Sequence, residues 1–173
     1  MIYEPREDSF LLKKYVERYA RGKVLDIGTG SGILAEAALK KTKNVLALDI
    51  DEDCVNFCRN KGINAIKSDL FENVNGKFDL IIFNLPYLPE DKKEDAEIRR
   101  QVCGGKRGNE ILERFLREVK DYLEEKGKIL IVVSSLTPEV EELISEYGFR
   151  YKILEKKKLF FEELKVYLLK YNF

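Results

Sequence analysis

Short apolar runs rich in Val, Ile and Leu alternate along the chain with amphipathic segments of helical length. This alternation predicts a mostly parallel sheet with helices on both faces, because parallel strands are buried on two sides and are linked by helices. The predicted strands are 23–27, 44–49, 64–68, 78–83, 128–134, 150–157 and 163–171. The predicted helices are 7–20, 31–41, 52–61, 109–124 and 138–147.

The last two predicted strands differ from the others in how they are connected. Only a short link around Leu159 joins strand 150–157 to strand 163–171, whereas a parallel crossover needs about a dozen residues or more. We therefore expect a seven-stranded α/β sheet that ends in an antiparallel hairpin. The consecutive lysines at 156–158 are typical of a solvated strand at a sheet edge.

The composition excludes several classes of protein. With 173 residues, of which 45% are hydrophobic, the chain can bury one substantial core, and we expect a single domain over residues 1–173. The 31 basic and 31 acidic residues cancel, so no global positive field would hold the protein on nucleic acid. No apolar run has the length of a membrane span and no signal-peptide pattern is present, so we expect a cytoplasmic protein. Charged residues make up 36% of the chain, a share typical of proteins from thermophiles.

The cysteines predict neither a metal site nor a disulfide. Cys54, Cys58 and Cys103 form no CxxC pair, and the chain contains no histidine. Cys54 and Cys58 lie four residues apart and can share one helix face. Small buried apolar residues are a sufficient explanation for them, and we expect no redox chemistry.

A predicted strand runs into a glycine turn at residues 24–32, Val-Leu-Asp-Ile-Gly-Thr-Gly-Ser-Gly. Glycines let the backbone approach a ligand closely, which makes Gly28 and Gly30 candidate binding residues. The spacing is GxGxG, with Ile33 where the GxGxxG of dinucleotide folds has its third glycine, and this disfavours NAD. Asp26 would repel a pyrophosphate but attract the ammonium and sulfonium of S-adenosyl-L-methionine.

Two further acids follow the next two predicted strands. Asp49 ends the second strand, where a carboxylate can accept both hydroxyls of a ribose. Asp69 and Leu70 follow the third strand, where a carboxylate can bind an adenine amino group and an apolar side chain can pack on the ring. Each acid alone can equally be a helix cap or a turn residue, but acids at successive carboxyl ends of strands favour a ligand site.

The fourth predicted strand places Asn84-Leu85-Pro86-Tyr87 at the same edge, at the start of an unusually long loop. An amide or aromatic amino nitrogen is a poor nucleophile because its lone pair is delocalised, so a catalyst must aim that lone pair at a methyl group. The Asn84 side-chain oxygen and the Leu85 carbonyl can accept its two N–H bonds. Pro86 can stiffen the turn and Tyr87 can stack on the planar group. A plain turn uses the same residue types, but the glycine turn and acids favour catalysis.

This combination resembles the S-adenosylmethionine-dependent methyltransferases that carry an (Asp/Asn/Ser)-Pro-Pro-(Tyr/Phe) tetrapeptide and have a Rossmann-like methyltransferase fold. Segments 3–12, Tyr-Glu-Pro-Arg-Glu-Asp-Ser-Phe-Leu-Leu, and 104–110, Gly-Gly-Lys-Arg-Gly-Asn-Glu, resemble the HemK-type glutamine methyltransferases. Their small archaeal and eukaryotic branch is the most similar, and the likeness covers nearly the whole chain. Leu85 stands where the family has its first proline; its carbonyl is retained, so we expect activity to survive with a looser loop.

The resemblance implies methylation of the side-chain amide nitrogen (N5) of the glutamine in the Gly-Gly-Gln motif of a peptide chain release factor. Asn84 would hold this amide. Members of the branch commonly work with a small zinc-binding activator protein, which would add to the sheet beside strand 64–68. The resemblance also implies which residues bind the cofactor, and the motifs above add Gly30 and Asn84. The predicted cofactor-binding residues are Ser9, Asp26, Gly28, Gly30, Asp49, Asp69, Leu70 and Asn84.

Two other functions stay open on the sequence alone. A nucleic-acid amino methyltransferase, acting on adenine N6 or guanine N2, would use the same tetrapeptide with a flipped base stacked on Tyr87. The balanced charge and the lack of a target-reading domain speak against it. A non-catalytic cofactor-binding or docking protein is the other, and the intact Asn84 and Tyr87 argue against it. Solvated loop charges are the simpler interpretation of the basic residues Arg99, Arg100, Lys106 and Arg107, which can otherwise hold phosphates or an acidic partner.

Overall fold

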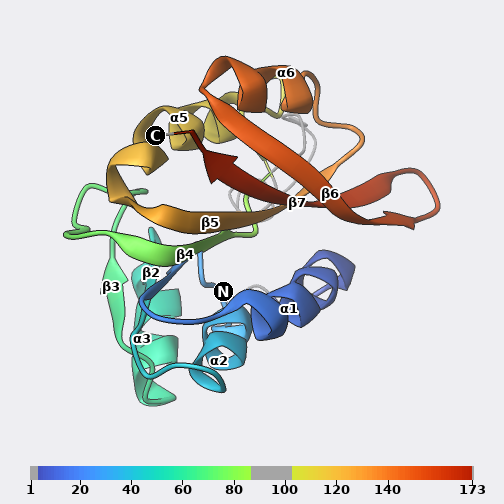
Figure 1. Cartoon of the computed structure of the whole chain (residues 1–173). Helices are drawn as coiled ribbons and strands as arrows, with labels where there is room; N and C mark the ends of the chain where they lie inside the picture. The colour runs from blue at the N-terminus through green and yellow to red at the C-terminus, as the bar shows by residue number, and fades with distance from the viewer. Residues whose placement is uncertain (1–3, 87–102, 173) are drawn as a thin grey trace.

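The computed structural model describes residues 4–86 and 103–172. It contains a seven-stranded sheet in the order β3-β2-β1-β4-β5-β7-β6 (Figure 1). The strands are β1 (Val24–Ile27), β2 (Val45–Asp49), β3 (Ala65–Lys67), β4 (Phe78–Phe83), β5 (Leu123–Ser134), β6 (Phe149–Lys158) and β7 (Glu163–Tyr171). The helices are α1 (Glu7–Tyr19), α2 (Ile33–Leu39), α3 (Glu52–Asn60), α5 (Glu110–Val119), the 3-10 helix η1 (Lys120–Tyr122) and α6 (Val140–Glu146).

The pairing of the strands confirms the predicted fold class. Strands β1 to β5 pair in parallel, and β7 pairs antiparallel with both β5 and β6. The chain therefore ends in the expected antiparallel hairpin. Strand β6 lies at one edge of the sheet and β3 at the other, so the lysines at 156–158 occupy an edge strand, as predicted.

The helices form a layer on each face of the sheet. Helices α1, α2 and α3 cover one face, and α5 and α6 cover the other (Figure 1). Side chains of the central strands alternate between the two apolar layers: in β4, Leu80 and Ile82 pack in the first layer and Ile81 and Phe83 in the second. Both sides of these strands are buried, which explains why the strands are apolar throughout.

The predicted boundary between helix 109–124 and strand 128–134 is wrong. Helix α5 ends at Val119 and strand β5 already begins at Leu123. Leu123 is fully buried and pairs with Phe78, so tertiary pairing overrides the helical propensity of the charged residues around it. The other predicted elements agree with the structure to within two residues at each end.

Strand β5 carries a bulge directly after Leu123. The register with β4 passes from Phe78↔Leu123 to Leu80↔Lys128, so several residues of β5 oppose one residue of β4. Gly127 lies in the bulge, and a Cβ there would come within 2.7 Å of Leu123 Cδ1. This irregularity is what hid the start of the strand from a pattern of alternating residues.

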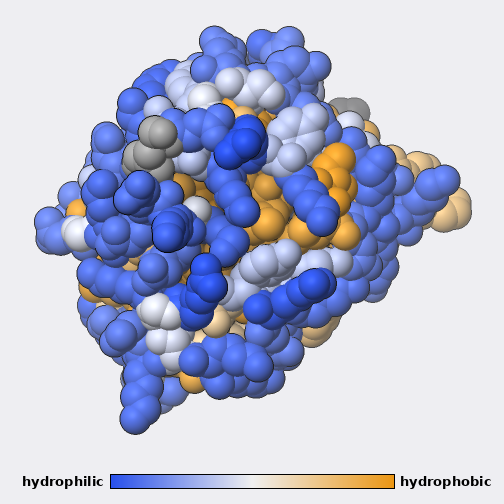
Figure 2. Space-filling view, viewed as in Figure 1, coloured by the Kyte–Doolittle hydropathy of each residue, from blue (hydrophilic) through white to orange (hydrophobic). Residues whose placement is uncertain are grey.

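The surface is mostly hydrophilic, with an apolar projection at the tip of the β6–β7 hairpin (Figures 1 and 2). Phe160 and Phe161 lie in this tip, where their side chains are 90% and 84% exposed.

Cys54 and Cys58 are buried on α3, which confirms that they are small core residues. In residues 4–86 and 103–172, no helix has the length and apolar character of a membrane span and no cluster of metal-ligating side chains occurs.

Candidate active site

Four predicted site residues leave adjacent strands at the carboxyl edge of the sheet. Asp69 follows β3, Asp49 ends β2, Gly28 follows β1 and Asn84 follows β4. The strand order β3-β2-β1-β4 sets these four positions in one row. Open α/β sheets bind their ligands at this edge, so the row is the candidate active site.

The glycine turn between β1 and α2 has the backbone that its sequence predicts. Gly28, Gly30 and Gly32 have φ of 64°, 52° and 81°, which glycine adopts without the steric penalty of other residues. A Cβ at Gly32 would come within 2.8 Å of Ile63 Cδ1 and 3.0 Å of Cys58 Sγ. Gly32 therefore permits the close packing that the third glycine of a dinucleotide turn permits one residue later, and this explains the GxGxG spacing.

Asp26 is a fully buried carboxyl group next to this turn. The Thr29 hydroxyl donates a hydrogen bond of 2.8 Å to Oδ2, whereas Oδ1 accepts none from the part of the chain that the structure describes. Burial raises the pKa of Asp26 to about 7, and the Thr29 hydroxyl offsets this only in part. A buried carboxylate with an unsatisfied oxygen suits a cationic ligand group such as an ammonium.

The Asp49 carboxylate joins the end of β2 to the glycine turn. Its Oδ2 accepts a hydrogen bond of 2.9 Å from the Gly30 N–H, and its Oδ1 accepts one of 3.0 Å from the Asp51 N–H. Burial raises the pKa of Asp49, and these two backbone N–H groups oppose the rise. Because a carboxylate offers about four lone-pair sites, Asp49 keeps capacity for further hydrogen bonds.

The Asp69 carboxylate has a partner that the sequence did not suggest. The Nη1 atom of Arg114, on α5, lies 3.0 Å from both carboxylate oxygens. An arginine on an amphipathic helix gives no signal of such a contact in the sequence. The pair fixes the orientation of Asp69 while lone pairs on each oxygen stay available.

Leu70 has an unusual backbone for a leucine. Its φ of 47° lies in the left-handed region, which disfavours a residue with a Cβ by roughly 1–2 kcal/mol. The Ser68 hydroxyl holds the turn by donating a hydrogen bond of 2.8 Å to the Leu70 carbonyl. Such strain is often retained where a side chain must be aimed at a ligand, and Leu70 lies beside Asp69 in the row.

The Asn84 amide is held by a buried hydrogen-bonded chain from α1. Asn84 Nδ2 donates to Ser9 Oγ at 3.1 Å, and Ser9 Oγ donates to Asp8 Oδ1 at 3.3 Å. Asp8 and Ser9 are only 6% and 3% exposed. The Asn84 side-chain nitrogen already donates to Ser9. The side-chain oxygen, Oδ1, is therefore the atom that can accept a hydrogen bond from a substrate.

Leu85 and Pro86 are described, and Tyr87 lies outside the described residues. Leu85 is 1% exposed and packs in the apolar layer beneath α5 and α6, so leucine stabilises the turn where the family has proline. A Cβ on Gly104 would come within 2.7 Å of the Pro86 carbonyl oxygen. Gly104, the first of the two glycines after the loop, thus lies directly against Pro86.

The segment that follows these glycines is fixed by its own acid. Glu110 accepts hydrogen bonds from the backbone N–H groups of Arg107 and Gly108, at 2.9 and 3.1 Å. Burial alone would raise the pKa of Glu110, but these N–H groups outweigh it and lower the pKa. The Arg107 side chain pairs with Glu139 at the surface, and Lys106 is exposed. Arg99 and Arg100 lie outside the described residues.

Comparisons with known proteins identify the family of this chain. Residues 7–161 match the family model of the methyltransferase small domain. A Methanocaldococcus jannaschii protein, whose name assigns it as a protein N5-glutamine methyltransferase, is 43% identical over 95% of this chain and 89% of its own length. The release factor glutamine methyltransferase of Rhodopirellula baltica is 30% identical over 75% of this chain, which spans 50% of that longer protein.

A solved structure has the same fold. The Mtq2–Trm112 complex of E. cuniculi, described as responsible for methylation of the eRF1 translation termination factor, matches with a TM-score of 0.80 and 27% identity. The match covers 99% of both chains. The chain therefore belongs to the methyltransferase small-domain family of S-adenosylmethionine-dependent methyltransferases.

Proposed function

We propose that this protein transfers a methyl group from S-adenosyl-L-methionine to the side-chain amide nitrogen of the glutamine in the Gly-Gly-Gln motif of a peptide chain release factor. One observation carries the proposal. The row at the carboxyl edge ends at Asn84. Its side-chain nitrogen donates to Ser9, and its side-chain oxygen can accept a hydrogen bond from a substrate. The names of the relatives, which include glutamine methyltransferases, support the choice of acceptor.

The order of groups along the row suits the parts of the cofactor in sequence. Asp69 and Leu70 would bind the adenine, and Asp49 the two ribose hydroxyls. Gly28 and Gly30 would leave room for the methionine end, whose ammonium suits the buried carboxylate of Asp26. Asn84 is next in the row, beside Gly28, because Ile27 pairs with Phe83. When bound, the cofactor supplies a methyl group activated by its sulfonium.

The residues of the tetrapeptide would orient the acceptor rather than deprotonate it. Asn84 Oδ1 and the Leu85 carbonyl accept the two N–H bonds of the glutamine amide and so turn its lone pair toward the methyl group. These two acceptors would hold the amide nitrogen while it takes the methyl group that the cofactor would supply, and the nitrogen would then release one proton to water. Pro86 would limit the motion of the turn, and Tyr87 would stack on the amide plane.

We also propose an activator partner at the β3 edge. The solved relative is a complex with Trm112, and β3 is a short edge strand of which Lys67 is exposed and Ile66 half-buried. A small zinc-binding protein would extend the sheet there by pairing with the backbone of β3. The chain would act as a single methyltransferase domain in the cytoplasm.

The decisive test supplies labelled S-adenosyl-L-methionine to the purified protein, alone and with its partner. The acceptors are an archaeal or eukaryotic-type release factor, the same factor with its Gly-Gly-Gln glutamine replaced by alanine, and single-stranded and duplex oligonucleotides. Label on the intact factor alone supports the proposal. Label on the alanine variant would overturn the choice of this glutamine. Label only on nucleic acid would overturn the protein substrate and favour the adenine or guanine amino methyltransferase.

A further inference from the structure

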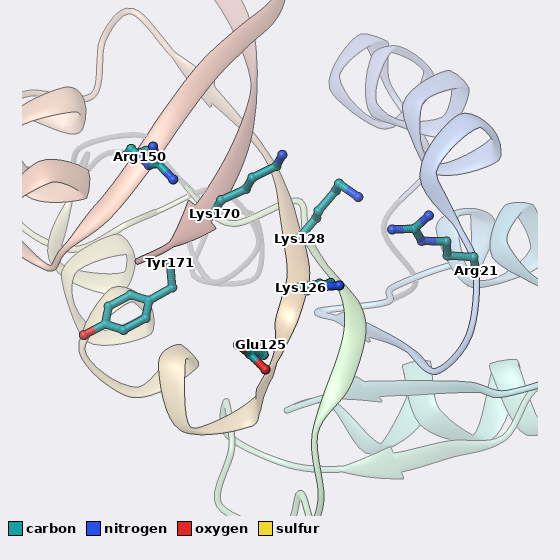
Figure 3. A pocket seen from close by; sticks show the side chains of 8 residues that line it. Arg21, Glu125, Lys126, Lys128, Arg150, Lys170 and Tyr171 are labelled. Carbon is teal, nitrogen blue, oxygen red and sulfur yellow. The ribbon is translucent and has the colours of Figure 1, made fainter. Parts of the chain in front are cut away.

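A second concave site lies at the amino edge of the sheet, opposite the candidate active site. It is a pocket of about 360 Å³, shown in Figure 3. Four of its residues come from separate segments at that edge: Arg21 precedes β1, Lys128 begins the regular part of β5, Arg150 is the second residue of β6 and Lys170 is the last but one of β7. The complete lining is Arg21, Glu125, Lys126, Gly127, Lys128, Arg150, Lys170 and Tyr171.

The sheet places three of these cations in one row. Lys170 on β7 pairs directly with Arg150 on β6, and Lys128 and Lys170 both lie one residue beyond the Ile129–Leu169 pair. Like charges that face each other on neighbouring strands repel and destabilise the sheet. Figure 3 shows the side chains of Lys128 and Lys170 close together, with Arg21 approaching from the segment after α1.

No salt bridge among the described residues compensates this repulsion. Within residues 4–86 and 103–172, none of the five cations of the pocket forms a salt bridge, and Glu125 pairs with none of them. Burial lowers the pKa of Lys128, and the charges of Arg21 and Lys170 lower it further. The whole chain is electrically neutral, so this cluster is a local concentration of positive charge.

We propose that this pocket binds an oligophosphate group, that is, two or more linked phosphates of a small ligand. Lysine ammonium and arginine guanidinium groups are the usual protein partners of phosphate oxygens. Several cations around one pocket, without salt bridges to the described residues, favour a ligand with several negative charges. The pocket volume falls in the range of small-ligand sites, and a hollow of this kind suits a compact group better than an extended nucleic-acid strand. The proposal is independent of the methyltransferase function.

Calorimetric titration of the intact protein, without S-adenosyl-L-methionine or substrate, tests the proposal. The titrants are inorganic tripolyphosphate, orthophosphate, ATP and a single-stranded RNA with a 5′-hydroxyl. Tripolyphosphate is expected to bind at least about tenfold more tightly than orthophosphate, because more charged hydrogen bonds form. Tighter binding of ATP than of tripolyphosphate, lost in Lys128→Gln/Lys170→Gln, would mean that the ligand of this pocket is a nucleotide. Equal binding would mean that the phosphates alone are recognised.

Variants connect binding to the row of cations. The double variant Lys128→Gln/Lys170→Gln should lose at least about tenfold in tripolyphosphate affinity, and Lys128→Arg/Lys170→Arg should restore it. Lys158→Gln, an exposed lysine at the other end of β6, removes one charge far from the pocket and should bind normally. The proposal is overturned if the glutamine double variant binds like the wild type, if orthophosphate binds as tightly, or if RNA binds more tightly than tripolyphosphate.

Discussion

The two edges of the sheet differ in whether their polar and charged side chains have partners within the described residues. At the carboxyl edge, polar side chains are held by partners: Asp49 by two backbone N–H groups, Asp69 by Arg114, and Asn84 by Ser9. At the amino edge, the described cations of the pocket have no salt-bridge partners and face one another. The first edge is organised to orient a ligand, whereas the second is organised to attract one.

The same contrast extends to protonation. Burial raises the pKa of Asp26 to about 7 and lowers the pKa of Lys128, so it favours the uncharged form of both groups. A cationic ligand at Asp26 would lower its pKa again, so binding near pH 7 should release a proton at the carboxyl edge. An anionic ligand beside Lys128 would oppose the lowering of its pKa.

The largest expected effect is that of Asn84→Ala. Removal of a preorganised hydrogen-bonding group that acts on the transition state lowers kcat by about 100- to 1,000-fold. Cofactor affinity should change little, because the side-chain hydrogen bond of Asn84 goes to Ser9 and not to the glycine turn. Single-turnover methylation and calorimetric binding of S-adenosyl-L-methionine measure the two effects separately.

Asn56→Ala is the matched control, since Asn56 is exposed on α3 and should leave both quantities unchanged. A fall in cofactor affinity as large as the fall in kcat would show that Asn84 belongs to the cofactor site. The carboxyl edge would then orient only the cofactor, and the acceptor would have to be held elsewhere.

The next effect concerns pH. Because the pKa of Asp26 is about 7 in the ligand-free protein, cofactor binding that needs its carboxylate must release a proton below that pH. Affinity for S-adenosyl-L-methionine should weaken about tenfold for each pH unit below 7 and level off above it. Titration in buffers of different ionisation enthalpy counts the released proton.

Asp26→Asn provides the control for this titration. The variant should bind the cofactor with no pH dependence in the same range, whatever its absolute affinity. For folding, the raised pKa of Asp26 means that its own contribution to stability is greatest at low pH and falls as pH rises from about 4 through 7. The stability of the wild type relative to Asp26→Asn should therefore fall over this range, and a relative stability that rises would contradict the burial of this carboxyl group.

A smaller effect is expected at Asp49. Asp49→Asn keeps the shape of the side chain but removes one acceptor, so cofactor affinity should fall about tenfold, the value of one charge-assisted hydrogen bond. At saturating cofactor, kcat should stay near that of the wild type. Asp53→Asn, an exposed acid in the first turn of α3, is the control. Unchanged binding in Asp49→Asn would remove Asp49 from the ribose site.

Much of the carboxyl edge could be predicted from sequence because it is built from local signals. The glycine turn, Asp26 and Asp49 each stand next to an apolar strand that periodicity identifies, and parallel strands bring their carboxyl ends together. The strand order, which sets Gly28 beside Asn84, follows from the pairing of Ile27 with Phe83. Sequence showed these residues as candidates, and the structure adds that they form one row.

Contacts between distant segments could not be predicted. Arg114 is an ordinary residue of an amphipathic helix, and Ser9 was expected only at the cofactor. Nothing near either residue in the sequence points to its contact with Asp69 or Asn84. The basic pocket was missed for the same reason, since its cations lie far apart in the chain and converge only through the antiparallel pairing of β7. The bulge after Leu123 also concealed the start of β5, which carries Lys128.

The smallest expected effect tests whether charge repulsion at the amino edge destabilises the ligand-free protein. Lys170→Gln removes the central charge of the row and should stabilise the ligand-free protein by about 0.2–1 kcal/mol, the range for a cross-strand pair. Lys165→Gln, on the same strand, removes a lysine that pairs with Glu141 at 3.2 Å, so this control should be neutral or destabilising. Urea unfolding at low salt measures both, and added salt should reduce the gain in Lys170→Gln because it screens the repulsion. If both variants lose stability equally, Lys170 stabilises the sheet by packing alone. Charge repulsion at the amino edge would then not destabilise the ligand-free protein.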